Sequence, residues 1–136
     1  MNIKRFVAAS LAVFVVAMAL EFLVHGVILM ATYESLSHLW RPGAKSMWWM
    51  IVPVLLVVSP LFTYIFVKGY ENKGILEGVR FGVIIGLFTC FPTACGIYAM
   101  IAIPYSLALQ WFVYGMIQVI VLGIVAALIY KPAASA

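Results

Sequence analysis

Four long apolar stretches constrain what this chain can fold into. They run over about residues 6–30, 47–67, 79–101 and 105–130, and each holds the roughly 20 residues that a helix needs to cross a bilayer. A transmembrane barrel would instead need alternating segments of about 10 residues. The stretches therefore predict an all-α integral membrane four-helix bundle, in which residues 1–136 form a single transmembrane domain.

Charged residues are too scarce to cover a surface that faces water. They make up 9% of the 136 residues, and 67% of the chain is hydrophobic. A soluble domain carries about 25% charged residues. This composition excludes a soluble enzyme, a disordered chain and a nucleic-acid binder, so the net charge of +4 is read against a lipid bilayer.

The short connections predict two helical hairpins. Residues 31–46, 68–78 and 102–104 join the stretches, and the shortest connection makes the last two helices antiparallel neighbours. Lys and Arg gather at the cytoplasmic ends of membrane helices, while Trp favours the interfaces. The side with the termini holds six basic residues, namely Lys4, Arg5, Lys68, Lys73, Arg80 and Lys131, whereas the other side holds two, Arg41 and Lys45. The tryptophans Trp40, Trp48, Trp49 and Trp111 fall at the boundary of that second side. We therefore expect both termini in the cytoplasm.

The first stretch has a second interpretation. Lys4 and Arg5, followed by apolar residues and by Ala17 and Ala19, have the form of a signal peptide with a cleavage site. The apolar run continues beyond Ala19, however, and reaches a length suited to a membrane span. We therefore favour an uncleaved first helix.

Small residues recur at every fourth position of the third stretch. Such a face lets another helix approach closely, so we predict tight packing inside the bundle; contact with another subunit or a flat ligand stays open. In the first stretch, Ala9, Val13 and Ala17 share a face with Glu21 and His25, and these two faces could meet lengthwise. The face of the third stretch consists of Gly74, Gly78, Gly82, Gly86, Cys90 and Ala94.

Glu21 is the only acidic residue inside a predicted span, with His25 one turn further along. An ionisable group at membrane depth is costly and suggests a function, and Glu and His at this spacing can share a proton or bind a metal. We expect Thr93, Tyr98, Gln110 and Tyr114 at similar depth. The group is either a satisfied polar cluster or a proton, metal or substrate site, unless Glu21 simply reaches the outer interface.

Glu34 and His38 repeat this spacing in the outer loop, where the lack of Gly and Pro over residues 28–40 predicts helix. All four residues are weak candidates for metal ligands. On one continuous helix, however, Glu34 would lie about 140° around the axis from Glu21. We therefore favour two separate solvated pairs.

No cofactor is predicted. A bis-histidine haem site needs two histidines on different membrane helices, and only His25 qualifies. The chain has no Asp, hence no Ser–His–Asp set, and it has no P-loop or dinucleotide fingerprint. Cys90 and Cys95 lie on one helix with different directions and should not pair. Gln118 could hydrogen-bond to a neighbouring helix, for example at Ser59.

Several short runs resemble a group of small bacterial four-span inner-membrane proteins. They are His25-Gly26, HLWRP at 38–42, KGYENKGILEGVRFG at 68–82 and SLALQWF at 106–112. The resemblance covers nearly the whole chain and implies a bacterial inner-membrane protein. It implies no activity.

We expect a non-enzymatic protein that packs as an accessory or structural subunit in a larger membrane complex, with other subunits or further copies of itself as partners. The alternative is a small binding or transport protein that uses Glu21 and His25 for protons, a divalent metal or a small amphiphile. A membrane enzyme acting on a lipid or quinone lacks a recognisable nucleophile or ligand set.

Overall fold

The computed structural model describes residues 1–130 and is helical, with no strand in that part of the chain. Four helices are long and apolar enough to cross a membrane: Ile3–Ile28, Ala44–Lys68, Ile75–Met100 and Tyr105–Ile129. The prediction of a multi-pass helical bundle is therefore confirmed. Lys131, one of the basic residues that predict the orientation, lies outside the described residues.

The first membrane helix changes its winding before it ends. Helix α1 (Ile3–Glu21) begins after Asn2, whose side chain accepts a hydrogen bond from the Arg5 amide (3.2 Å). It continues as a π-helical segment, η1 (Phe22–Ile28). The chain then turns at Leu29 into the short helix α2 (Met30–Ser35).

The outer connection is a series of short helical turns. The 3-10 segments η2 (Ser37–Leu39) and η3 (Ala44–Met50) lead into helix α3 (Ile51–Lys68). The expectation of helix through residues 28–40 holds only in pieces, because the backbone leaves helical geometry at Leu36 (φ −103°, ψ 20°). Glu21 and Glu34 do not share one helix either, because the chain turns at Leu29 between η1 and α2.

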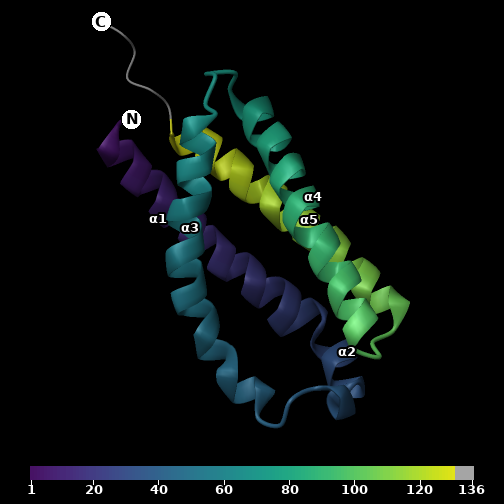
Figure 1. Ribbon diagram of the computed structural model, residues 1–136. Helices are drawn as coiled ribbons and strands as arrows, with labels where there is room; N and C mark the ends of the chain where they lie inside the picture. The colour runs from purple at the N-terminus through teal and green to yellow at the C-terminus, as the bar shows by residue number, and fades with distance from the viewer. Residues whose placement is uncertain (131–136) are drawn as a thin grey trace, which may run out of the picture.

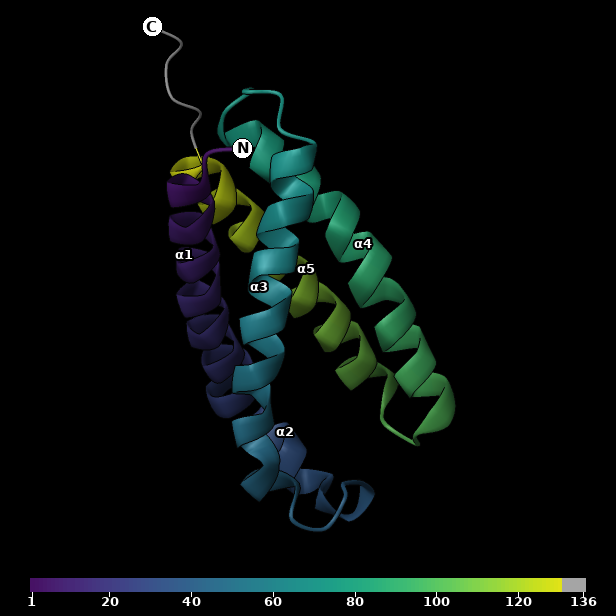
Figure 2. The same ribbon diagram turned by 60° about the vertical axis from the view of Figure 1, so that its left-hand side comes forward.

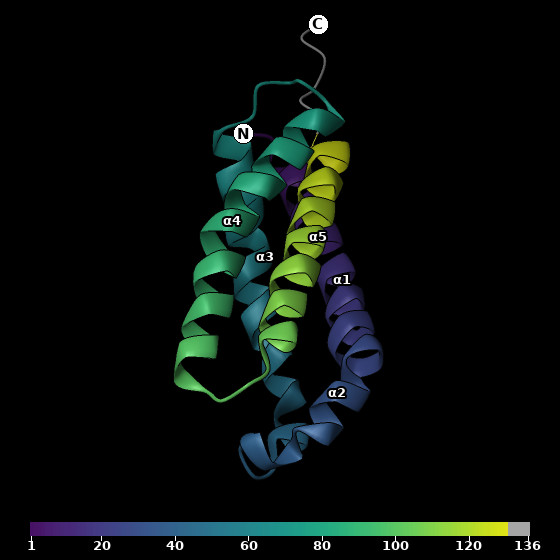
Figure 3. The ribbon, with the colours of Figure 1, turned by 90° about the vertical axis from the view of Figure 1, so that its right-hand side faces the viewer.

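Helices α4 (Ile75–Met100) and α5 (Tyr105–Ile129) complete the bundle. They run side by side as an antiparallel hairpin (Figures 1 and 3), while α1 packs against α3 and α5 (Figure 2). The N-terminus, the α3–α4 loop and the end of α5 lie at one end, which we call the terminal end. Helix α2 and the α4–α5 loop lie at the opposite end, which we call the loop end.

The small-residue face of α4 packs against α5. A Cβ atom on Gly82 would lie 2.5 Å from the Cα atom of Ile120, and one on Gly78 would meet the carbonyl of Gly123. The expectation that this face meets α1 is not met, because α5 occupies it and is the main partner of α4. Gly74 takes no part, since it precedes α4 with φ +74° and a Cβ atom there would meet nothing within 4 Å.

Two apolar clusters lie at the two ends. The terminal cluster joins α1, α3 and α5 through Ala9, Val13, Phe62, Phe66, Ala126, Ala127 and Tyr130, with Phe81 of α4 packed against it. The loop cluster comprises Val24, Leu29, Ile103, Leu107 and Ala108, with Tyr33, Trp40, Trp111 and Tyr114 against it. The candidate site lies between these clusters.

The α3–α4 loop is held by acidic side chains. Glu77 is 4% exposed, and its carboxylate accepts hydrogen bonds from the amides of Glu71 (2.5 Å) and Lys73 (2.8 Å). The Glu71 carboxylate pairs with the side chains of Lys73 (2.5 Å) and Arg80 (3.2 Å), and these hydrogen bonds lower its pKa. These contacts lie within residues 68–82, the longest of the runs that resemble the bacterial proteins, and give that run a role in holding the loop.

Candidate functional site

The site starts with Glu21 and His25, where α1 passes into its π-helical segment. His25 Nε2 lies 3.6 Å from Glu21 Oε2, and both side chains are about a quarter exposed (27%). π-Helical turns inside α-helices are rare and frequently occur at functional sites. The predicted proximity of Glu21 and His25 is therefore present at a point where the helix departs from regular winding.

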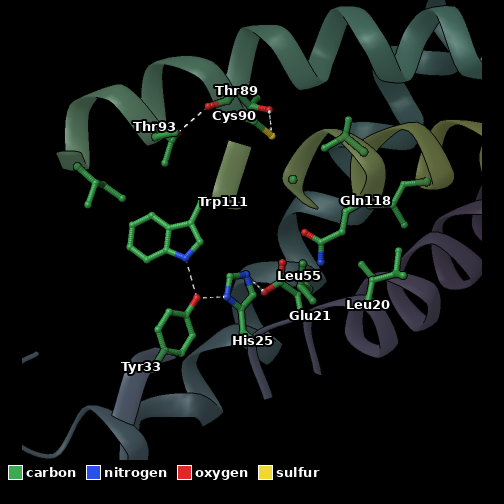
Figure 4. Close-up of a pocket in the computed structure, with 16 residues that line it drawn as sticks. Leu20, Glu21, His25, Tyr33, Leu55, Thr89, Cys90, Thr93, Trp111 and Gln118 are labelled. Atoms are coloured by element: carbon green, nitrogen blue, oxygen red, sulfur yellow. Dashed lines mark hydrogen bonds and ion pairs between the residues drawn. The ribbon is translucent and has the colours of Figure 1, made fainter. Parts of the chain in front are cut away.

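Tyr33 and Trp111 extend this pair into a chain of four side chains (Figure 4). The turn at Leu29 brings Tyr33 back over His25, so that their rings stack and His25 Nδ1 lies 2.5 Å from the Tyr33 hydroxyl. Trp111 of α5 donates its Nε1–H to the same hydroxyl at 2.7 Å. Trp40 supports Tyr33 by donating to its backbone carbonyl at 2.9 Å.

The hydrogen bonds determine where the protons in this chain lie. Burial raises the pKa of Tyr33 to about 12, so its hydroxyl keeps its proton at neutral pH. The indole of Trp111 can only donate, so the Tyr33 oxygen accepts from it, and His25 Nδ1 is the one side-chain acceptor that the described residues place beside the Tyr33 proton. An imidazole that accepts at Nδ1 is neutral and carries its proton on Nε2. That proton faces Glu21.

A cavity of about 510 Å³ opens beside this chain, between the two apolar clusters. Its walls come from α1, α3, α4 and α5. Thr89 and Thr93 border it from α4, and Gln118 projects into it from α5 (Figure 4). The threonine hydroxyls donate to carbonyls one turn back (2.8 and 2.6 Å), so only their acceptor sites face the cavity freely.

His25 and Tyr33 also border two further cavities. A large one of about 1310 Å³ lies under the outer connection, where Trp40, Trp48 and Trp111 line it. A smaller one of about 410 Å³ lies toward α3 and includes Glu21 in its wall. The His25–Tyr33 pair therefore stands at the junction of all three spaces.

Some predicted members of the polar cluster lie elsewhere. Thr93 lines the cavity, but Tyr98 is exposed and packs edge-on against Tyr105. Tyr114 packs against the loop cluster, and Gln110 is exposed. Similar depth in the membrane was the only basis for grouping them, and depth does not determine which side of a helix a residue occupies.

The second predicted Glu–His pair is not formed. Glu34 pairs with Lys45 at 3.1 Å, and His38 lies exposed in η2. Within residues 1–130, no three His, Cys, Asp or Glu side chains gather as a metal site would require. Both cysteines are free thiols.

Gln118 does not bond to Ser59. The Ser59 hydroxyl is buried and has no hydrogen-bond partner in the described part of the chain. Gln118 instead belongs to the cavity wall.

Sequence reasoning missed Tyr33 and Trp111 as site residues, and expected Trp111 only at the membrane interface. Their hydrogen bond joins positions 78 residues apart. The available signal was the aromatic content of the loop and of the start of the last stretch, which did not reveal that the loop folds back.

Comparisons with protein-family models, with curated proteins and with solved structures give no match. The resemblance to small bacterial four-span proteins therefore stays a prediction. Function is inferred below from the geometry of this site alone.

Proposed function

We propose that this chain is a small membrane protein that binds an amphipathic small molecule in the 510 Å³ cavity, with Glu21 and His25 as its polar contacts. The cavity carries the proposal, because its apolar walls surround a connected set of polar side chains. Cavities of about 300–1,000 Å³ with a few placed polar groups are typical of small-molecule sites. Binding of this kind requires no catalytic group.

The polar residues of the cavity include groups left free for a ligand. Gln118 has both a donor and an acceptor in the wall, and the Glu21 carboxylate has only His25 beside it, at 3.6 Å. A buried polar group without a partner is costly. A ligand with a hydrogen-bonding head group would satisfy these groups while its apolar part contacts the walls.

Among the ligand classes considered from the sequence, an amphiphile is the best supported. A divalent metal is usually held by three or more protein ligands or by carboxylates with water, whereas Glu21 and His25 supply two. A proton alone needs no cavity of this volume. An amphiphile uses both the volume and the polar chain.

Native mass spectrometry of protein extracted gently from its own membranes tests the proposal. We expect a bound small molecule on the wild type and on Glu34→Gln, whose carboxylate lies outside the 510 Å³ cavity. We expect none on Glu21→Gln, which keeps the shape and removes the charge. Equal ligand occupancy on all three proteins would contradict the assignment of Glu21.

A second candidate function is that of an accessory subunit in a larger membrane complex. One observation favours it: α4 packs mainly on α5 and touches α3 through Phe81, so much of its remaining surface is open to lipid, to another protein or to a second copy. The glycine face, which motivated this hypothesis, is already occupied by α5. Other polypeptides at fixed stoichiometry in the same spectra would support the accessory role.

We further propose that the protein lies in a bacterial inner membrane with its terminal end in the cytoplasm. The basic residues support this orientation, because Lys4, Arg5, Lys68, Lys73 and Arg80 belong to the terminal end and only Arg41 and Lys45 to the loop end. A membrane-impermeant maleimide should label Ser37→Cys from outside the cell and should not label Lys68→Cys. The reverse pattern would overturn the orientation.

A further inference from the structure

The 510 Å³ cavity contains a carboxylate but no basic side chain. No Lys or Arg of the described residues lines it, and Glu21 is its sole acidic group. At the loop end, Lys45 is already paired with Glu34 (3.1 Å). An ionised Glu21 would therefore lack a positively charged partner from the cavity wall, unless His25 supplied one.

His25 does not supply that charge. Among the described residues, its Nδ1 is the one acceptor placed beside the Tyr33 hydroxyl, which itself accepts from Trp111. A protonated imidazole would present a second donor to this hydroxyl and leave the Tyr33 proton without an acceptor. The hydrogen-bond chain thus favours a neutral His25 beside Glu21.

An unpaired carboxylate in a membrane is costly when ionised. Pairing with a cation brought by the ligand removes this cost. The aromatic rings of the cavity favour such a ligand, since cations bind to ring faces. Trp111 and Tyr33 line the cavity, and Trp48 lines the adjoining 410 Å³ space, which also reaches Glu21.

We infer that the ligand is a lipophilic organic cation, which binds to the Glu21 carboxylate. This inference rests on the proposed function and names its ligand class. No covalent bond to the ligand forms.

Few other ionisable side chains line the cavity with Glu21. His25 faces it from its own helical run, Tyr33 from α2 and Cys90 from α4. The described wall residues from α3 and α5, namely Leu55, Trp111, Gly115, Gln118, Val119 and Leu122, are not ionisable. Binding of the cation is therefore assigned to the Glu21 carboxylate.

The test measures binding of three matched probes to the purified full-length protein in lipid nanodiscs. Tetraphenylphosphonium is the cation, tetraphenylborate is an anion of the same shape, and triphenylphosphine oxide is a neutral relative. We expect only the phosphonium to bind.

Three variants separate charge from folding. Glu21→Gln should abolish phosphonium binding, Glu21→Asp should retain it, and Glu34→Gln should behave as wild type. Equal binding of the neutral or anionic probe would overturn the inference and leave amphiphile binding intact. Failure of the wild type to bind any of the three probes would contradict the proposed function as well.

Discussion

The terminal cluster and the loop cluster lie at opposite ends of the bundle but are built from different contacts. At the terminal end, small residues bring the helices together and Phe62, Phe66 and Phe81 meet edge to face at 4.9–5.3 Å. At the loop end, the aromatic rings are tied by hydrogen bonds through Tyr33, and three cavities meet beside them.

This difference separates stability from binding. In lipid, helices associate mainly through close packing, because the bilayer is as apolar as the side chains. The terminal half satisfies this requirement through its small residues and its buried aromatic rings. The loop half leaves space, and its polar chain keeps the walls of that space in place.

The largest expected effect on stability comes from adding a bulky side chain at the contact between α4 and α5. Gly82→Leu should lower the free energy of unfolding by about 3 kcal/mol or prevent assembly, because a Cβ atom there would lie 2.5 Å from the Ile120 backbone. Thermal unfolding in detergent measures the effect. Gly96→Leu is the matched control, since a Cβ atom at Gly96 meets nothing within 4 Å; equal loss in the two variants would refute the packing argument.

Removing a large side chain from the terminal cluster should lower stability by a similar or slightly smaller amount. Phe66 is 2% exposed, and Phe66→Ala should cost about 3 kcal/mol through lost contacts and a residual cavity. Phe88→Ala removes the same side chain from a position that is 79% exposed and should change stability little. Calorimetry of both variants would show whether this end carries the packing energy, and similar melting temperatures would argue against it.

Breaking the polar chain should affect stability least and binding most. Tyr33→Phe keeps the ring but leaves Trp111 Nε1 and His25 Nδ1 without their partner, at a cost of about 1–2 kcal/mol. Tyr105→Phe, at an exposed position, is the control. We expect ligand binding to weaken only in Tyr33→Phe, and unchanged binding would remove Tyr33 from the site.

The same variant gives a pH test. The pKa of Tyr33 is raised to about 12 by burial, above the value of about 10 in an unfolded chain. A raised pKa means that the stabilisation is complete below about pH 10 and is lost as pH rises toward 12. The wild type should therefore lose stability more steeply than Tyr33→Phe over this interval, and parallel curves would contradict the assignment.

The sequence predicted those features that depend on local spacing. The apolar stretches located the helices, and the four-residue period placed Gly78, Gly82 and Gly86 on one buried face. Glu21 and His25 were expected to meet because they lie one turn apart. Each of these predictions needs only the geometry of a single helix.

Features that depend on how helices meet were not predictable in the same way. Spacing alone could not tell that the glycine face packs on α5 and not on α1. Tyr33 reaches His25 only because the helix changes to π winding and then turns at Leu29. Nothing in residues 22–28 signals that change in hydrogen bonding, so the site could be predicted only in part.

The contact between Gly78 and Gly123 limits how these positions can change in evolution. Each glycine lies against the backbone carbonyl of the other, so a side chain at either position would clash with main-chain atoms. Where two positions touch through their side chains, a larger residue at one can be accommodated by a smaller residue at the other. A main-chain clash cannot be relieved by such a substitution. Positions 78 and 123 cannot compensate each other in this way, so we expect both to stay glycine in homologous proteins and to show no correlated substitution.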